Sequence, residues 1–414
     1  MLHVIASHQS RPSDDPIFAL NKEATQRKER GEIVVNATVG TLLDDEGKLA
    51  VLPTAARAVH EVPAGEWAAY APIAGTPAFL RAVTEDLLGG EPALRAAAVA
   101  TATPGGTGAL RHAIANFLDP GQALLTTSFY WGPYQTLADE SDRRVETFAM
   151  FTRTGVGGRP QTPGNDASSG LDVAALDAAL GRQIEQQGRV LLFLNDPCHN
   201  PTGYSMRREE WKKVTDCLRD HASRAPITLL VDFAYSAYGP GDPRSLLSDL
   251  APLLGKVVLL FAWSASKTFT HYGLRVGALV SVIADERERR TTEAALSYSC
   301  RGTWSNCTRG GQAAITRLLT DPSLRAACDA ERGRLKAMLR ARVDRFNDLA
   351  RPRGLSYPRY DGGFFVTVFH DRANEKALAM KESGVFVVPQ EGALRLALCS
   401  VAERDIPRLV DALG

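Results

Sequence analysis

Short apolar runs rich in β-branched residues alternate with longer helix-like patterns between positions 98 and 283 of the chain. This alternation is typical of βαβ units, in which successive strands form a largely parallel sheet and the intervening helices cover both of its faces. The predicted strands span residues 98–102, 123–127, 190–194, 227–231, 257–262 and 276–283. The pattern therefore predicts an α/β fold with a mostly parallel central sheet.

The pattern changes from about residue 321, where a long charged helix precedes short strands at 364–368 and 394–398. We expect a second, smaller α+β domain there, joined by the N-terminal segment. The predicted division is residues 1–45 as an N-terminal arm and part of the small domain, 46–320 as the large domain and 321–414 as the small C-terminal domain. Residues 152–170, rich in Gly, Pro and Ser, are predicted to form an exposed inserted loop.

Composition and charge narrow the classes of protein to consider. The 414 residues are 44% apolar and 23% charged, with a formal net charge of +1. This near-neutral balance, without a basic run, argues against a nucleic acid or an anionic membrane as the main partner. No apolar stretch reaches the length of a membrane span, and the first residues lack the pattern of a secretion signal. We therefore expect a cytoplasmic enzyme.

The six cysteines are scattered, and no two of them form a CxxC pair. This spacing predicts reduced, mostly buried thiols; it favours neither a disulfide framework nor a metal site.

Polar clusters follow five of the predicted strands directly. In chain order they are "TPGGTG", "SFYWGPY", "NDPCHNPTG", "DFAY" and "WSASK". In open parallel sheets the carboxyl ends of the strands meet at one edge, where ligands bind. We therefore expect all five clusters to lie around one crevice.

The first cluster, at residues 103–108, is a glycine-rich turn between a strand and a helix. Without Cβ atoms, its N–H groups can approach an anion that the helix N-terminus also attracts, so the turn favours phosphate. A tight turn that needs a positive φ would explain the same glycines. The segment is neither GxGxxG nor GxxxxGK[ST], so it lacks the dinucleotide and P-loop patterns.

Lys267 lies in the cluster "SASK", eight residues before Arg275. A desolvated lysine near another cation has a lowered pKa and can form a Schiff base with an aldehyde. Arg275 supplies that cation and a guanidinium suited to phosphate oxygens, and Ser264 adds a hydroxyl donor. A solvated surface charge is the alternative for a single lysine, but a phosphate site at the same sheet edge favours the catalytic interpretation.

Asp232 ends a buried strand, where a carboxylate needs a cationic partner such as a protonated pyridine nitrogen. Tyr235 and Asn200 could both donate to an oxygen on the same ring. A Schiff-base lysine, a carboxylate, ring-oxygen donors and a phosphate site together indicate pyridoxal 5'-phosphate as the cofactor.

The segments "TPGGTGALR", "CHNPTG", "DFAY", "SASK" with its later arginine, and "LRLAL" near the C-terminus follow one another in a familiar order. In this order the chain resembles the pyridoxal-phosphate-dependent aminotransferases of fold type I, in the aspartate and aromatic amino acid branch. The resemblance runs from about residue 15 to the C-terminus. It implies the fold of that family and a ping-pong amino transfer with Lys267 as Schiff-base lysine and proton shuttle.

The resemblance also implies roles for single residues. Asp232 corresponds to the pyridinium partner, and Tyr235 and Asn200 to the ring-oxygen donors. Arg395 is similar to the arginine that binds the substrate α-carboxylate, opposite the backbone at Val39 and Gly40. The residues that resemble the rest of the cofactor site are Gly105, Gly106, Thr107, Ser264 and Arg275 around the phosphate and Trp131 against the ring face.

Members of this family are homodimers with shared active sites. By that resemblance Tyr70 and Ser305 would reach the cofactor phosphate of the neighbouring subunit, and Arg301 would enter its substrate pocket. Arg301 would then pair with a distal carboxylate. The segment "SCRGTWSNCTRGG" departs from the family pattern after Ser-Asn, and Arg309 competes for the same role.

The resemblance implies an aminotransferase that moves the α-amino group of a dicarboxylic or aromatic L-amino acid to a 2-oxo acid, with 2-oxoglutarate as the expected acceptor. Two other functions use the same residues. The first is another pyridoxal phosphate reaction, such as β-elimination or Cα decarboxylation. The second is a non-catalytic cofactor-binding regulator, which would need an appended DNA-binding domain that we do not expect before the first family-like residues.

Overall fold

The computed structural model describes residues 3–5, 8–9, 11–12, 16–152 and 170–414. Most of the predicted loop at 152–170 therefore lies outside the described residues. Within the described residues, no helix is both long and apolar enough to span a membrane.

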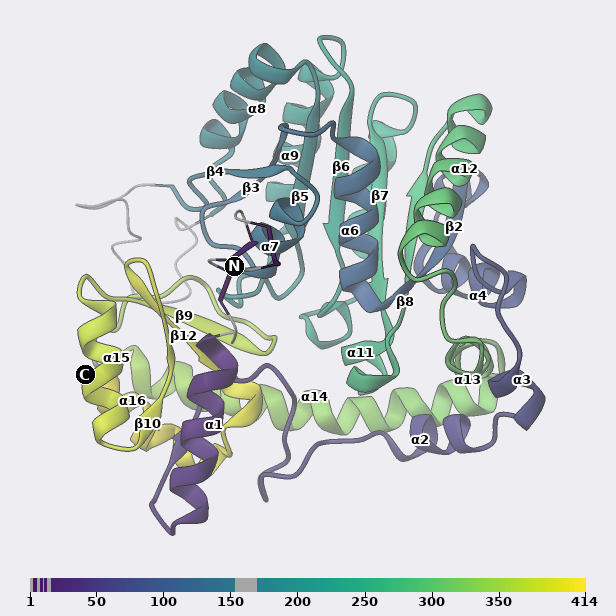
Figure 1. Cartoon of the computed structure of the whole chain (residues 1–414). Helices are drawn as coiled ribbons and strands as arrows, with labels where there is room; N and C mark the ends of the chain where they lie inside the picture. The colour runs from purple at the N-terminus through teal and green to yellow at the C-terminus, as the bar shows by residue number, and fades with distance from the viewer. Residues whose placement is uncertain (1–2, 6–7, 10, 13–15, 153–169) are drawn as a thin grey trace.

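A seven-stranded sheet forms the centre of the larger part of the molecule (Figure 1). Its strands lie in the order β2 (Ala98–Pro104), β8 (Val276–Val282), β7 (Val258–Ser264), β6 (Ile227–Asp232), β5 (Val190–Asn195), β3 (Ala123–Thr127) and β4 (Arg144–Phe148). Strand β8 runs antiparallel to both of its neighbours, β2 and β7, and the other pairs of the sheet are parallel. The prediction of a mostly parallel α/β sheet is confirmed, and all six predicted strands are present.

Alternate residues of the central strands pack on opposite faces of the sheet. On β5, Leu191 and Phe193 belong to a cluster with α6 (Gly105–Phe117), α7 (Pro133–Asp139) and α12 (Glu286–Thr303). Leu192 and Leu194 belong to the cluster on the other face, with α4 (Pro77–Leu88), α8 (Val173–Gln187) and α9 (Arg208–His221). Because both faces are covered, these strands are apolar throughout, which is why the sequence pattern identified them.

Shorter elements complete the larger part. They are α2 (Pro53–His60), α3 (Ala64–Ala68), α5 (Pro92–Ala96), α10 (Ser245–Leu250), α11 (Ala265–Thr268) and α13 (Arg309–Thr320), with 3-10 turns at Ser236–Tyr238, Ala251–Leu253 and Tyr272–Leu274. The long helix α14 (Pro322–Ala350) packs against α2 and α13 and extends to α16 in the smaller part (Figure 1).

The smaller part holds an antiparallel sheet in the order β11 (Val388–Gln390), β12 (Ala393–Ala397) and β9 (Phe365–Phe369). A parallel pair joins β1 (Val35–Asn36) to β10 (Val385–Phe386). The surrounding helices are α1 (Pro16–Glu29), α15 (Ala373–Glu382) and α16 (Ile406–Leu413), with 3-10 turns at Leu398–Ser400 and Glu403–Asp405. One hydrophobic core joins Val35 and Ala37 to apolar residues between 343 and 413.

This shared core supports the expectation that the N-terminal segment belongs with the small domain. The boundaries near residues 45 and 320 stay a prediction.

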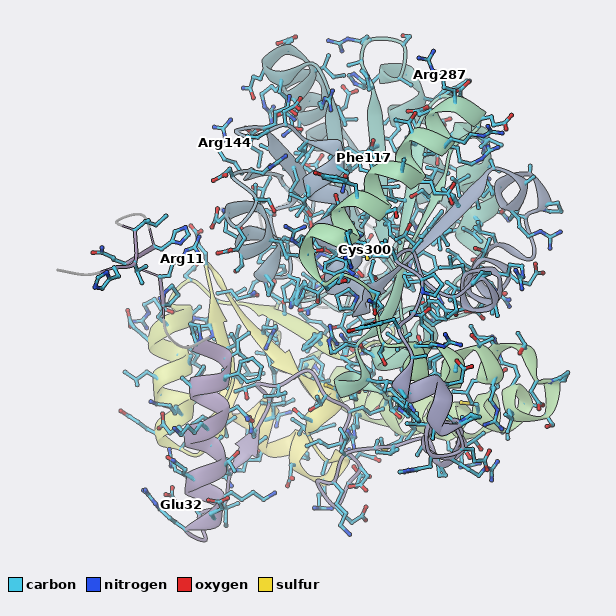
Figure 2. All side chains as sticks on the ribbon, turned by 45° about the vertical axis from the view of Figure 1, so that its right-hand side comes forward. Arg11, Glu32, Phe117, Arg144, Arg287 and Cys300 are labelled. Carbon is cyan, nitrogen blue, oxygen red and sulfur yellow. The ribbon has the colours of Figure 1, made fainter. Side chains whose placement is uncertain are left out.

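Many charged side chains lie on the surface, and the thiols lie inside. Glu32, Arg144 and Arg287 are exposed and project from the ribbon, whereas Cys300 on α12 is buried (Figure 2). All six cysteines are buried and none forms a disulfide, as the sequence predicted.

Candidate active site

The carboxyl ends of the parallel strands surround one pocket. The polar residues that line it come from all five predicted clusters: Gly106, Thr107, Trp131, Asn195, Asn200, Asp232, Tyr235, Ser264, Ser266, Lys267 and Arg275. Arg275 joins them because it immediately precedes β8, whose antiparallel direction starts it at this edge. The expectation of one shared crevice therefore agrees with the geometry.

Lys267 lies in the short helix α11, directly after β7. Burial lowers the pKa of its amine, and the nearby Arg275 lowers it further, while the charge of Asp232 opposes this shift. The Nζ atom lies 5.2 Å from the centre of the Tyr235 ring. A buried amine with a lowered pKa can lose its proton and act as a nucleophile or base.

Asp232 ends β6 and is buried. Its carboxylate accepts hydrogen bonds from Tyr134 Oη at 2.9 Å and from the Ala234 N–H at 3.1 Å. Burial raises the pKa of this carboxyl, and the hydrogen bonds and Lys267 only partly offset the effect. A carboxylate in this environment is ionised most readily when a cation lies against it.

Asn200 and Tyr235 meet on the other side of the pocket. Asn200 Nδ2 lies 3.3 Å from Tyr235 Oη, and the Asn200 N–H donates to Asn195 Oδ1 at 2.7 Å. Asn195 Nδ2 in turn donates to the backbone oxygen of Asp232 at 2.9 Å. Asn200 Oδ1 is buried and has no partner among the described residues. The Asn200 amide and the Tyr235 phenol therefore converge here, and each carries a hydrogen that can be donated to a ligand oxygen.

The glycine-rich turn at the start of α6 faces Arg275. Gly105 has a φ of +69°, and a Cβ there would lie 2.5 Å from an Arg275 guanidinium nitrogen. Both explanations of the turn therefore hold, because it needs a positive φ and also leaves room beside a cation. Arg275 donates to Ser266 Oγ at 3.2 Å and itself adopts a left-handed φ of 54°. Hydroxyls, a guanidinium and a helix N-terminus suit a phosphate group.

Arg395 lies on β12 of the smaller sheet and is buried. Its guanidinium stacks over the Phe365 ring, 4.9 Å from the ring centre, and donates to the backbone oxygen of Thr38. Gly40 packs against the same ring so closely that a Cβ would lie 2.4 Å from it. Arg395 and Gly40 therefore share one environment, although neither lines the pocket around Lys267.

Tyr70, Ser305 and Arg301 also lie apart from the residues that line this pocket. Tyr70 is 86% exposed, and Arg301 donates to Ser305 Oγ at 2.6 Å. Arg309 instead forms a two-point ion pair with Glu66, at 2.7 and 3.1 Å. Arg309 is therefore paired with a carboxylate of its own chain.

Sequence reasoning missed Tyr134 and Asn195 as site residues. Both stand in clusters that it had singled out, as the last residue of "SFYWGPY" and the first of "NDPCHNPTG". Asn195 ends β5 and Tyr134 lies at the start of α7, shortly after β3, and these positions were the available signal. Their contacts with Asp232 depend on packing between segments 98 and 37 residues apart.

The sheet, its strand-end pocket and the buried lysine together fit a pyridoxal-phosphate-dependent enzyme of fold type I. Residues 32–413 match the family described as aminotransferase class I and II. The chain belongs to that family and is a pyridoxal-phosphate-dependent aminotransferase, as predicted.

Individual relatives agree with this assignment. The chain is 27% identical to the aromatic-amino-acid aminotransferase of Paracoccus denitrificans over 412 aligned residues. This alignment covers 96% of each chain. It is 28% identical over 336 residues to an aspartate aminotransferase of Pseudomonas aeruginosa, covering 79% of this chain and 78% of the relative.

Solved structures have the same fold. An aminotransferase from Anaerococcus prevotii superposes with a TM-score of 0.90 and 31% identity, covering 100% of this chain and 98% of that one. An aromatic-amino-acid aminotransferase from Burkholderia pseudomallei, described as covalently bound to pyridoxal phosphate, has a TM-score of 0.79 at 23% identity, covering 99% of each chain. These comparisons place the chain in the aspartate and aromatic branch.

Proposed function

We propose that this aminotransferase transfers the α-amino group of a dicarboxylic or aromatic L-amino acid to 2-oxoglutarate. The observation that carries the proposal is the single pocket lined by Lys267, Asp232, Asn200, Tyr235 and Arg275. Relatives named as aspartate, aromatic-amino-acid and tyrosine aminotransferases support this range of donors.

Pyridoxal phosphate, when bound, withdraws electrons from the substrate Cα and makes its proton acidic. The residues present fit this group. We assign its phosphate to Gly105, Gly106, Thr107, Ser264 and Arg275, where a turn without Cβ atoms faces a guanidinium and hydroxyls. The donors of Asn200 and Tyr235 suit its ring oxygen, and Trp131 suits its ring face.

Lys267 is the residue that moves the proton. Because burial and Arg275 lower the pKa of its amine, Nζ could accept the α-proton of the substrate as a general base and return it to a carbon of the cofactor. Asp232 would hold the ring nitrogen of the bound cofactor in its protonated form, since a buried carboxylate is ionised most readily beside a cation. Arg395 binds the α-carboxylate through its planar guanidinium, with the backbone at Gly40 opposite.

We also propose that the active enzyme is a homodimer in which Tyr70, Ser305 and Arg301 complete the neighbour's site. Tyr70 is almost fully exposed, and the large side chains of Trp67 and Tyr298 are exposed as well. Exposed aromatic side chains of this size are typical of protein interfaces. In that arrangement Arg301 rather than Arg309 would meet a distal carboxylate, because Arg309 already pairs with Glu66.

The test is to mix the holoenzyme with single amino acids, record the absorption of the cofactor and identify the products. A true donor should bleach the band of the lysine-bound cofactor and release its 2-oxo acid, and 2-oxoglutarate should restore the band. Pyruvate with ammonia from a donor that carries a β-leaving group would instead indicate β-elimination. Release of CO₂ would indicate decarboxylation, and an unchanged band with every amino acid would contradict catalysis.

A further inference from the structure

The loop at residues 198–205 carries Asn200 and is held by residues from the smaller part of the molecule. It follows β5, and its inner side faces the pocket through Asn200. Its outer side contacts the segment 359–367, more than 150 residues later in the chain. The position of Asn200 therefore depends on contacts between the two parts.

Thr367 makes the contact nearest to Asn200. It is fully buried on β9, and its Oγ1 donates a 2.9 Å hydrogen bond to the backbone oxygen of Pro201. On the other side, Thr367 is paired in register with Arg395 of β12. Directly opposite residues of an antiparallel pair project from the same face. One hydroxyl thus links the strand pair that carries Arg395 to the residue next to Asn200.

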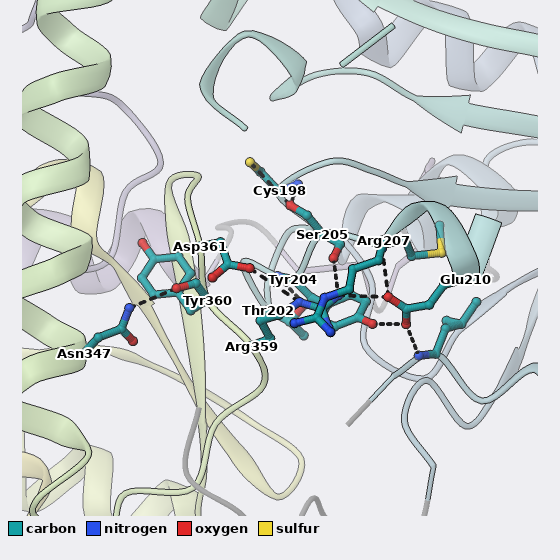
Figure 3. A network of polar contacts seen from close by, with 12 residues as sticks. Cys198, Thr202, Tyr204, Ser205, Arg207, Glu210, Asn347, Arg359, Tyr360 and Asp361 are labelled. Carbon is teal, nitrogen blue, oxygen red and sulfur yellow. Dashed lines mark hydrogen bonds and ion pairs between the residues drawn. The ribbon is translucent and has the colours of Figure 1, made fainter. Parts of the chain in front are cut away.

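Two further contacts hold the same loop. Gly203 has a φ of +71°, and a Cβ there would lie 2.1 Å from the backbone oxygen of Phe365. Arg359 donates to the backbone oxygen of Ser205 at 2.7 Å and to Glu210 at 2.9 Å, with its guanidinium 4.6 Å from the centre of the Tyr204 ring (Figure 3).

Arg359 and Glu210 are 3% and 13% exposed in their side chains. A buried ion pair recovers its desolvation cost only in good geometry, so the pair fixes Arg359, which holds the loop through the backbone oxygen of Ser205.

On the pocket side, two hydrogen bonds hold Asn200. Asn200 is fixed by its own N–H to Asn195 and by the 3.3 Å contact of Nδ2 with Tyr235. A shift of Pro201 would therefore be passed to the Asn200 amide through the chain.

We propose that Thr367 is a positioning residue that couples the strand pair carrying Arg395 to Asn200 in the cofactor pocket. The proposal rests on the proposed function, in which Asn200 donates to the ring oxygen of the cofactor. The Thr367 hydroxyl donates to the backbone oxygen of Pro201 and acts on the pocket through Asn200.

The test is a pH titration of the visible absorption of the lysine-bound cofactor in the absence of substrate. A donor to the ring oxygen stabilises its negative charge and so lowers the pH midpoint of the spectral change. Asn200→Ala should therefore raise the midpoint. Thr367→Val keeps the shape of the side chain but lacks the hydroxyl, and it should raise the midpoint in the same direction by roughly half a pH unit.

The Asn200→Ala/Thr367→Val double variant should titrate like Asn200→Ala alone, because residues that act through one another are not additive. Thr367→Ser keeps the hydroxyl and should titrate like the wild type. If the shift in the double variant equalled the sum of the two single shifts, the coupling would be overturned. An unchanged midpoint in a folded Thr367→Val would overturn it as well. Either result would leave the proposed function intact. An unchanged midpoint in Asn200→Ala would instead contradict the role of Asn200 itself.

Discussion

Tyr134 Oη donates a 2.9 Å hydrogen bond to Asp232 Oδ2, and both side chains are buried. The tyrosine comes from α7 and the aspartate from the end of β6. This bond favours the ionised carboxylate and partly offsets the upward shift that burial imposes on the pKa of Asp232. Tyr134 therefore helps to keep Asp232 negatively charged, as a partner for a protonated ring nitrogen must be.

Tyr134→Phe should lower kcat by roughly ten- to a hundredfold, because a hydrogen bond to a charged group contributes roughly 1.5–3 kcal/mol. Without the hydroxyl, the pKa of Asp232 should rise further and its hold on the ring nitrogen should weaken. Steady-state kinetics with the best donor would measure the change. Tyr130→Phe is the matched control, because it removes a hydroxyl of the same segment that, among the described residues, forms no hydrogen bond with Asp232. Equal activity of both variants would show that the Tyr134 bond has no catalytic effect.

Lys267→Ala should abolish the covalent attachment of the cofactor and reduce turnover by roughly 10²- to 10⁴-fold or more, since a positioned general base contributes about that much. Borohydride reduction of the wild type followed by peptide mass spectrometry should find the cofactor on Lys267. The exposed Lys256 provides the control, and Lys256→Ala should keep both the adduct and the activity. An adduct on any other lysine would contradict the assignment.

Arg301→Met and Arg309→Met should have different effects, because the structure pairs only Arg309 with Glu66. Arg301→Met should raise KM for aspartate and 2-oxoglutarate by tenfold or more, as expected for losing a charged contact to a carboxylate, and leave KM for aromatic donors nearly unchanged. Arg309→Met should lower the melting temperature slightly without changing this preference. Kinetics with paired dicarboxylic and aromatic donors would separate the two cases. A selective loss in Arg309→Met alone would reverse the assignment.

The sequence was most informative where burial is uniform. The strands at the centre of the sheet were predicted because both of their faces are covered and their residues are apolar throughout. The edge strand β4 was missed, since its exposed Arg144 and partly exposed Glu146 interrupt the apolar pattern. The two-residue strands β1 and β10 are too short to leave a pattern.

The site followed from one rule, that the carboxyl ends of parallel strands meet. That rule brought Lys267, Asp232 and Asn200 together correctly without any knowledge of loop conformation. It could not reveal contacts between distant segments, such as that of Thr367 with Pro201 or of Arg309 with Glu66. Those contacts depend on how the two parts pack, which periodicity does not encode.

Asp196 should make the stability of the protein depend on pH, and a single substitution can measure its contribution. It is buried directly after β5 and accepts hydrogen bonds from Trp211 Nε1 at 2.9 Å and the Met206 N–H at 2.8 Å. Burial raises the pKa of its carboxyl from 3.8 to about 7, despite these bonds. In the unfolded chain the group returns to its ordinary pKa. Between about pH 4 and pH 7 the native state therefore keeps a proton that the unfolded state has released.

A native state that binds more protons loses stability as the pH rises, by up to about 1.4 kcal/mol per pH unit for one group. Asp196→Asn removes the titrating group and should therefore remove its contribution to the pH dependence of the unfolding free energy. Between pH 5 and pH 7 the wild type should lose roughly 2 kcal/mol of unfolding free energy relative to the variant, as measured by urea denaturation. Asp220→Asn, at an exposed position of α9, should instead give a curve parallel to that of the wild type. If the Asp196→Asn curve were also parallel, the carboxyl of Asp196 would be ionised in the native state throughout this range, and its burial would have to be compensated by the nearby charge of Arg359.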